Sequence, residues 1–188
     1  MTEFWAQKIY TLDGFQRQNV LEGKKALDVG CGIRKLPGAT GMDISKVPGV
    51  DVAHDANKTP WPLPDNSFDL ILFNQSLEHL EDIKKVLKEA WRILKKDGRV
   101  VAQVPYFRSN DAFADVTHKH FFTSNSLDYI PDFKFRIIGF WYGWPHKSQN
   151  PLRQAFKNFI HRFPDFYDKY LSLLISVECL TWELEVKK

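Results

Sequence analysis

Three aspartates and a pair of closely spaced glycines carry the clearest chemical signal in this sequence. Asp28 is followed by Gly30 and Gly32, Asp43 comes fifteen residues after Asp28, and Asp55 follows in the segment VAHDAN. Glycines at alternate positions let the backbone approach a ligand closely or adopt positive φ at little cost. In a parallel α/β sheet, an acid that ends the second strand accepts hydrogen bonds from ribose hydroxyls. The pattern therefore predicts a site for a ligand that contains a nucleoside.

The loop after Asp28 departs from the dinucleotide-binding fingerprint G-x-G-x-x-G, because Lys35 stands where the third glycine belongs. The residues that follow, IRKLPGATG, contain a proline and no strong helical pattern. No helix N-terminus is thus predicted to face a pyrophosphate. The nucleoside ligand need not carry one.

Asp55 has two interpretations. A carboxylate after the third strand accepts a hydrogen bond from an adenine amino group, whereas an aspartate at this position also serves as a turn or N-cap residue. Because Asp28 and Asp43 end the two preceding strands, we favour the ligand role for Asp55.

Short apolar strands that alternate with helices position these residues. The clearest helix is predicted over 78–96, where apolar residues recur at spacings of three or four and Asp97-Gly98 gives a stop signal. The run FDLILF at 68–73 is typical of a parallel strand covered on both faces. The alternation predicts an α/β fold with a doubly wound, mostly parallel sheet. The other strands are predicted over 26–29, 41–44, 50–53, 99–104, 133–142 and the final CLTWELEVKK.

Less regular segments complete the expected elements. A loosely helical lead-in is predicted over 4–21, a short helix over 124–130, and two further helices over 151–163 and 165–177. The alternating pattern of CLTWELEVKK predicts that one face of the last strand is better buried than the other.

Composition excludes several classes of protein. No apolar run approaches membrane-spanning length, and the N-terminal MTEFWAQKIY lacks the apolar core of a secretory signal. Cys31 and Cys179 are too few for a disulfide framework or a zinc site, so we expect a cytoplasmic protein with reduced thiols. The net charge of +3 is weaker than that of a dedicated nucleic-acid binder.

The segments DVGCG, GMDIS and HDANKTPWPLPDNSFDLILFNQSLEHL together resemble the class I S-adenosylmethionine-dependent methyltransferases, and most of all the type-11 group of small methyltransferase domains. The resemblance covers about residues 24–106. It implies a Rossmann-like sheet of seven strands in the order 3-2-1-4-5-7-6, with the last strand antiparallel, and S-adenosyl-L-methionine as the cofactor. The chain departs from many relatives at Arg34, where they have a further glycine.

The resemblance also implies how the cofactor is held. The glycines lie beneath its methionine part, and the first aspartate contacts its amino group directly or through water. The second aspartate binds the ribose, the third binds the adenine amine, and the residues after the fourth strand lie beside the methyl sulfonium. The implied cofactor-binding residues are Asp28, Gly30, Gly32, Asp43, Ile44, Asp55, Ala56, Asn74 and Gln75.

Histidines supply the candidates for a catalytic base, because they titrate near neutral pH. His79, in the Glu78-His79 pair that such methyltransferases share, is equally well explained as a packing residue. His118 and His120 follow the fifth strand and either act as a base or line a loop. Their D-x-x-H-x-H spacing lacks an evident fourth ligand, so no metal site is predicted. The candidate acceptor-binding residues are Tyr106, Arg108 and Asp115.

We expect a single domain over 1–188, with a helical lead-in over 1–23, a cofactor-binding half over 24–106 and an acceptor-side half over 107–188 that contains a helical insertion over 151–177. The expected reaction is methyl transfer to an oxygen or nitrogen of a small-molecule or glycan-type acceptor.

Two other functions stay open. An RNA or protein methyltransferase would use the basic residues Lys84, Lys88 and Arg92, and a non-catalytic cofactor-binding or scaffold subunit would need a partner chain. The apolar face of 151–163 is a lid, a surface for membrane or partner contact, or a helix packed on its own domain. The oligomeric state does not follow from the sequence.

Overall fold

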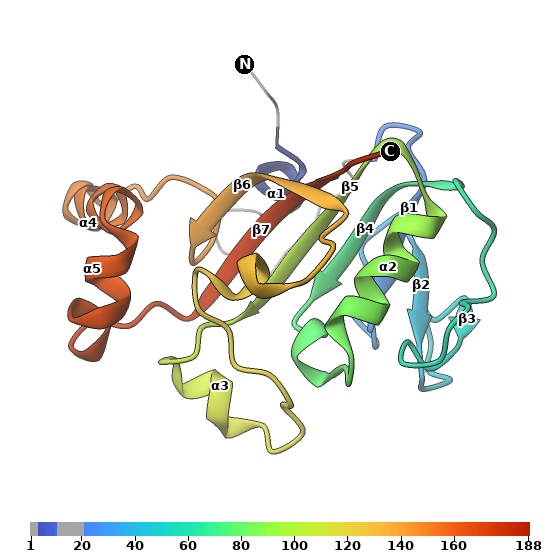
Figure 1. The fold of residues 1–188 in the computed structure, drawn as a ribbon, viewed down its shortest axis with the longest axis horizontal. Helices are drawn as coiled ribbons and strands as arrows, with labels where there is room; N and C mark the ends of the chain where they lie inside the picture. The colour runs from blue at the N-terminus through green and yellow to red at the C-terminus, as the bar shows by residue number, and fades with distance from the viewer. Residues whose placement is uncertain (1–3, 11–20) are drawn as a thin grey trace.

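A seven-stranded sheet in the order β3-β2-β1-β4-β5-β7-β6 forms the centre of the molecule (Figure 1). The computed structural model describes residues 4–10 and 21–188. Strands β1 to β5 pair in parallel, whereas β7 is antiparallel to both β5 and β6. The predicted fold class and strand order are therefore confirmed. The strands are β1 Ala26–Val29, β2 Thr40–Asp43, β3 Val52–Ala53, β4 Phe68–Asn74, β5 Leu94–Pro105, β6 Phe135–Tyr142 and β7 Cys179–Val186.

Helices cover both faces of this sheet. Leu70 and Leu72 of β4 belong to one buried cluster together with residues of α1, whereas Ile71 and Phe73 belong to a second cluster together with residues of α2. Successive residues of a strand point to opposite faces, so α1 and α2 lie on opposite sides of β4. The helices are α1 Trp5–Ile9, α2 Ile83–Ile93, α3 Asn110–Ala114, α4 Pro151–Arg162 and α5 Pro164–Lys169, with 3₁₀ turns η1 Leu77–His79, η2 Ser126–Tyr129 and η3 Leu171–Leu173.

Both ends of the helix predicted over 78–96 differ from the structure. The chain forms the short turn η1, and α2 begins only after Asp82, whose carboxylate accepts the amide of Lys85 at 2.9 Å. At the other end Leu94 already pairs with Phe68 as the first residue of β5. Strand pairing therefore overrides the helical periodicity beyond residue 93.

The last strand is buried on both faces, contrary to the expectation of one better-buried face. Glu183 is fully buried, and its carboxylate accepts the backbone amides of Trp5 and Ala6 at 3.1 and 3.0 Å. The same carboxylate forms an ion pair with Arg99 at 2.8 Å. The first turn of α1 thus covers a face whose alternating polar residues looked exposed from the sequence.

Other predicted helices are shorter in the structure. The lead-in predicted over 4–21 is helical at α1, and residues 11–20 lie outside the described residues. The helix predicted over 124–130 is the 3₁₀ turn η2, and the one predicted over 165–177 is divided into α5 and η3. Because Pro at the first position of a helix lacks only an amide that would be unpaired there, Pro151 and Pro164 begin α4 and α5.

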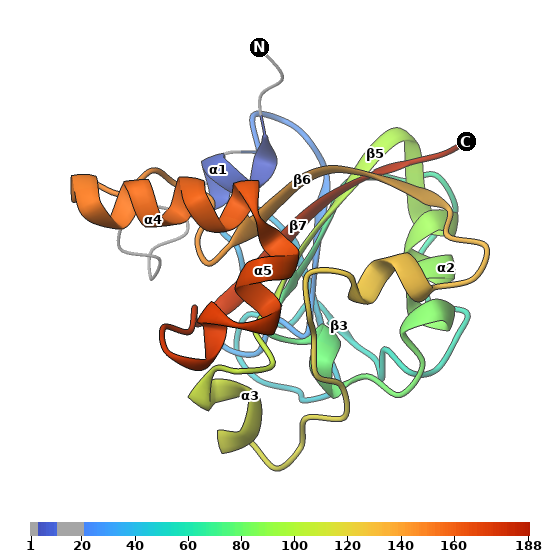
Figure 2. The same cartoon turned by 60° about the vertical axis from the view of Figure 1, so that its left-hand side comes forward.

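The pair α4 and α5 lies beside β6 at one end of the molecule (Figure 2). Ile160 of α4 is fully buried, whereas Leu152 is 80% exposed and Phe163 is 49% exposed. The apolar face predicted for 151–163 is thus only partly packed on the domain. Within the described residues, no helix is both long and apolar enough to cross a membrane.

Candidate cofactor site at the carboxyl edge of the sheet

Two cavities of about 640 and 420 Å³ open at the carboxyl ends of the parallel strands and share Gly30 and Gln75. The larger cavity is bordered by the loop after β1, by Asn74 and by Trp144. The smaller cavity is bordered by the ends of β2 and β3. In open α/β sheets this edge is where ligands bind. Predicted residues that line these cavities are Gly30, Gly32, Asn74 and Gln75 in the larger, and Gly30, Asp43, Ile44, Asp55, Ala56, Gln75 and His79 in the smaller.

Gly30 is required at this junction for two physical reasons. Its φ is +70°, a left-handed conformation that costs other residues energy. A Cβ atom on Gly30 would also lie 2.5 Å from the Cβ of Ser76. Ser76 in turn donates its hydroxyl to the carbonyl of Val29 at 2.7 Å. The two loops after β1 and β4 are therefore in direct contact, and this contact sets the wall that both cavities share.

Asp43 connects the glycine loop to the end of β2. Its Oδ2 accepts the amide of Gly32 at 2.9 Å, and its Oδ1 accepts the amide of Ser45 at 2.8 Å. Both carboxylate oxygens keep further lone pairs, because a carboxylate offers about four acceptor sites. The partly exposed side chain lines the smaller cavity. Asp43 is thus placed to accept hydrogen bonds from hydroxyl groups in that cavity.

Asp55 combines the two roles that the sequence left open. Its Oδ1 accepts the backbone amide and the side-chain amide of Asn57 at 3.0 and 3.1 Å, which is an Asx turn. These hydrogen bonds, led by the backbone amide of Asn57, lower the pKa of the carboxyl group. Asp55 also lines the smaller cavity next to Ala56. The turn fixes the carboxylate there in its charged form.

Asp28 has a different position from the other two aspartates. It is buried in β1, where its Oδ2 accepts the amide of Leu36 at 2.7 Å. Leu36 follows the glycine loop, so this hydrogen bond closes the loop against the strand. Asp28 is absent from the described residues that line the two cavities.

Gln75 has strained backbone geometry at the junction of the cavities. Its φ is +53°, and its amide donates to the carbonyl of Gln103 at 2.9 Å. A non-glycine residue in this region costs about 1–3 kcal/mol, and such strain concentrates at functional sites. Asn74 precedes it, and its Oδ1 accepts the hydroxyl of Tyr10 at 2.9 Å.

Outside the loop after β1, sequence reasoning missed three residues that line the larger cavity, namely Gln103, Asp111 and Trp144. Gln103 is completely buried on β5 and donates to the hydroxyl of Thr181 at 3.2 Å. The available signal was a single glutamine inside the apolar run VVAQVP, because burying a polar group is costly unless it forms hydrogen bonds. Trp144 comes from the segment after β6, and no sequence pattern relates that segment to this cavity.

The loop after β1 supplies a cation and a thiol to the larger cavity. Arg34 is exposed at its rim, and its amide donates to the carbonyl of Cys31 at 3.1 Å. Burial, with help from the nearby charges of Asp28 and Asp43, raises the pKa of the Cys31 thiol to about 11. The Cys31 side chain is therefore a neutral thiol at physiological pH.

The candidate acceptor residues do not line either cavity in the described part of the chain. Tyr106 is buried, and its hydroxyl donates to Asp168 at 2.8 Å. Burial raises the pKa of Tyr106, so this group is a neutral phenol. The guanidinium of Arg108 lies 4.8 Å from the ring centre of Phe107. Asp115 accepts the amide and the hydroxyl of Thr117 at 2.8 and 2.7 Å.

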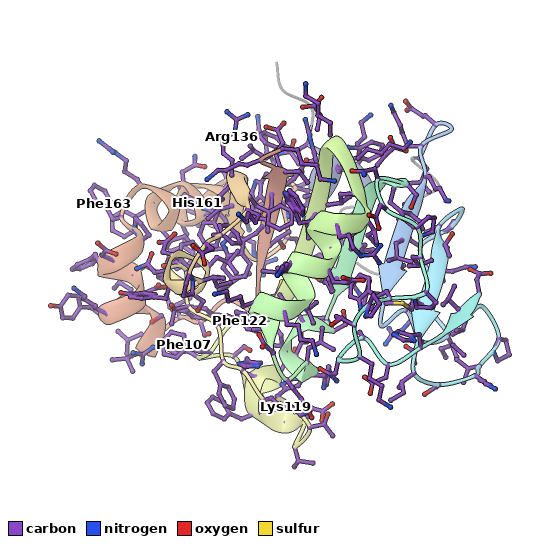
Figure 3. All side chains as sticks on the ribbon, turned by 45° about the vertical axis from the view of Figure 1, so that its right-hand side comes forward. Phe107, Lys119, Phe122, Arg136, His161 and Phe163 are labelled. Atoms are coloured by element: carbon purple, nitrogen blue, oxygen red, sulfur yellow. The ribbon has the colours of Figure 1, made fainter. Side chains whose placement is uncertain are left out.

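The segment after β5 closes on itself and attaches to the turn after β4. The amide of Phe107 donates to the carbonyl of Phe122 at 2.9 Å, and the two residues are labelled near one another in Figure 3. The amides of Lys119 and His120 donate to the carbonyl of Glu78 at 2.8 and 3.2 Å. These bonds bring two of the predicted histidines, His79 and His118, together with ring centres 4.7 Å apart.

Glu78 and His79 have altered proton affinities in this region. Glu78 is only 1% exposed, and burial raises the pKa of its carboxyl group to about 8. Burial, followed by the charge of His118, lowers the pKa of His79. His120 is separate from this pair, and its Nε2 is buried without a hydrogen-bond partner among the described residues.

The strand order and the connections of the sheet give a Rossmann-like fold of the class I methyltransferase type. Solved structures with this fold include a SAM-dependent methyltransferase from Archaeoglobus fulgidus, with a TM-score of 0.61, 18% identity and 86% of each chain covered. Another is an S-adenosylmethionine-dependent methyltransferase from Mesorhizobium loti, with a TM-score of 0.58, 17% identity, and 87% of this chain and 91% of that one covered.

Residues 27–102 match the family model described as a methyltransferase domain. The curated relatives include the demethylmenaquinone methyltransferase of Geobacillus sp. (strain WCH70), 33% identical in an alignment 114 residues long that covers 47% of this chain and 48% of the relative. The enzyme of the same name from Bacillus mycoides (strain KBAB4) is 29% identical in an alignment 123 residues long that covers 52% of each chain. The chain thus spans about half the length of the curated relatives that it matches.

These findings confirm the resemblance to the type-11 group of class I S-adenosylmethionine-dependent methyltransferases. The family match implies S-adenosyl-L-methionine as the cofactor. The residues of the carboxyl edge fit such a group, because glycines at positive φ, a carboxylate with unused acceptor sites and two adjoining cavities meet there.

Proposed function

We propose that this protein transfers the methyl group of S-adenosylmethionine to an oxygen or nitrogen atom of a small-molecule acceptor. The observation that carries the proposal is the pair of cavities that share Gly30 and Gln75. The smaller one has the acids expected for an adenosine. The larger one has room for the amino-acid part and for an acceptor beside it.

Within this proposal, Asp43 accepts hydrogen bonds from the ribose hydroxyls, and Asp55 with Ala56 contacts the adenine. Asp28 acts on the methionine part indirectly, because its carboxylate holds the loop that ends at Leu36. Arg34 at the rim of the larger cavity provides a positive charge for the methionine carboxylate. The arginine that departs from the family pattern thereby gains a binding role.

When bound, the cofactor supplies a methyl group that is already activated by its sulfonium. The chain then contributes position, and it excludes water from the reacting atoms. Asn74, Gln75 and Gln103 border the larger cavity with amide groups that donate and accept hydrogen bonds. Because these amide groups are uncharged, they can orient an acceptor by hydrogen bonds without protonating its nucleophilic atom.

A small acceptor is favoured over a polymer by two observations. The curated relatives are named for demethylmenaquinone, a small molecule. In addition, Arg92, one of the three basic residues that suggested RNA, is held by Glu89 at 2.6 Å and by Asp65. Its charge is thus partly neutralised within the protein.

Calorimetric titration with S-adenosylhomocysteine tests the cofactor part of the proposal. We expect saturable binding at one site, which Asp43→Asn weakens and which Asp65→Asn, an exposed carboxylate remote from the cavities, leaves unchanged. Absence of binding to the unmodified protein would overturn the proposed function. Transfer of labelled methyl groups to RNA or protein, with none to low-molecular-weight acceptors, would contradict the acceptor class.

Peripheral contact through the α4 surface forms a separate part of the proposal. Leu152 and Phe163 are exposed next to basic residues of α4. Flotation with anionic vesicles is the measurement, and we expect co-flotation that Leu152→Asp with Phe163→Asp removes. A protein that stays at the bottom of the gradient would contradict membrane contact.

A further inference from the structure

We propose that Glu78, His79 and His118 form a binding site for a divalent transition-metal ion of the zinc type, independent of the function proposed above. Each of the three side chains offers one ligand atom, and these atoms lie within 4.8 Å of one another. Within residues 4–10 and 21–188 this is the one group of three or more such residues that meets this distance. One carboxylate and two imidazoles are a common ligand set for Zn²⁺.

The hydrogen bonds of His79 determine which of its ring nitrogens is free to bind. Its Nδ1 lies 2.9 Å from the hydroxyl oxygen of Thr117. That hydroxyl has a single proton, which it donates to Asp115 at 2.7 Å. The Nδ1 of His79 must therefore carry a proton and donate it to Thr117. In the neutral imidazole, Nε2 is left with an unshared lone pair.

The same reasoning applies to His118. Its Nδ1 lies 3.0 Å from the carbonyl oxygen of Ala112, which can only accept. Nδ1 therefore donates, and Nε2 again holds a lone pair. This Nε2 faces the Oε1 of Glu78 at 4.0 Å. Metal-bound histidines characteristically donate their second nitrogen to a carbonyl or carboxylate network, as both rings do here.

Glu78 provides the independent observation that points to a ligand. Its side chain is 1% exposed, and neither carboxylate oxygen has a hydrogen-bond donor among the described residues. A buried carboxylate without a donor or a cation is costly. Because one ligand atom from each of the three side chains lies within 4.8 Å of the others, a single cation would satisfy the carboxylate and bind both imidazoles.

The spacing fits an ion after small side-chain rotations. Ligand atoms around a tetrahedral ion with bonds of about 2.1 Å lie about 3.4 Å apart. Side-chain movements of about 1 Å from the observed spacing suffice. Two distant segments supply the ligands, and the amides of Lys119 and His120 already fasten them through the carbonyl of Glu78. The D-x-x-H-x-H pattern alone did not predict a metal site, because only His118 belongs to it. The other two ligands, Glu78 and His79, come from the turn after β4.

The position of the site relates it to the candidate cofactor cavity. His79 also lines the smaller cavity, together with Asp43 and Asp55. Three protein ligands leave a fourth position on a tetrahedral ion open. An ion at this place could therefore bind a further oxygen ligand from the cavity side.

The test is equilibrium dialysis of metal-free protein against Zn²⁺, together with the visible absorption spectrum of the Co²⁺-loaded protein. We expect one ion per chain and a rise in the melting temperature. Glu78→Gln and His118→Gln should each weaken binding at least about 100-fold, and Thr117→Val, which removes only the hydroxyl that orients His79, about 10-fold to 100-fold. His120→Gln, in the same segment but outside the cluster, should keep the affinity of the unmodified protein.

Circular dichroism establishes that each variant is folded before binding is compared. Unmodified protein that binds Zn²⁺ no more tightly than Glu78→Gln would overturn the proposal, and the three groups would then share a proton. Equal loss of affinity in His120→Gln and His118→Gln would overturn the ligand assignment. Because no S-adenosylhomocysteine is needed, failure here is distinguishable from failure of the proposed function.

Discussion

Replacing Gly30 with alanine tests the contact that joins the two cavities. The added methyl group would lie 2.5 Å from the Cβ of Ser76 at a φ of +70°. The left-handed conformation costs an alanine about 1–2 kcal/mol, and overpacking against Ser76 adds about 1–3 kcal/mol. We expect the free energy of unfolding to fall by about 2–5 kcal/mol. Because Ser76 follows Gln75, the affinity for S-adenosylhomocysteine should fall as well.

Gly32 and Ser76 provide the controls. Gly32 also has a positive φ, +49°, but an added Cβ would meet nothing within 4 Å, so Gly32→Ala should cost only about 1–2 kcal/mol. Ser76→Gly in the Gly30→Ala background removes the clash and should show a coupling of about 1–3 kcal/mol in a double-mutant cycle. Urea unfolding measures the unmodified protein, the three single variants and the double variant. Equal destabilisation by the two alanine substitutions, with zero coupling, would refute the reasoning.

Three further predictions concern single groups. Asp43→Asn should weaken S-adenosylhomocysteine binding by about 1–3 kcal/mol in calorimetry, and unchanged affinity would remove the ribose assignment. Glu183→Gln removes the buried negative charge that pairs with Arg99 and accepts the amides of Trp5 and Ala6, and should lower the free energy of unfolding by about 3 kcal/mol. The exposed-pair control Glu185→Gln should change it by less than about 1 kcal/mol. Cys31 has a pKa of about 11, so the rate of its reaction with Ellman's reagent should rise about tenfold per pH unit from pH 7 to 10 in a Cys179→Ser background. The reaction should slow when S-adenosylhomocysteine fills the cavity that Cys31 lines. A rate that does not depend on pH would contradict this prediction.

Local patterns predicted the sheet well because each strand carries its own signal. The strands Phe68–Asn74 and Ala26–Val29 could be predicted from their apolar runs and from the turn residues that bound them. The helix over 78–96 failed where neighbouring strands compete for the chain, as the pairing of Leu94 with Phe68 shows. The alternating pattern of β7 wrongly predicted one less buried face, because Glu183 is covered by hydrogen-bond partners as far as 178 residues away along the chain.

For the site, the sequence by itself determined the glycines and the acids at the strand ends, since their chemistry and their order along the chain are local properties. Only the tertiary structure decided which of these residues share a cavity. It directed Asp28 toward Leu36 and brought Gln103 and Trp144 to the larger cavity. It also joined Glu78 and His79 to His118 through hydrogen bonds between segments about 40 residues apart. Contacts of this kind depend on how strands pair and loops fold back, and no local residue pattern records them.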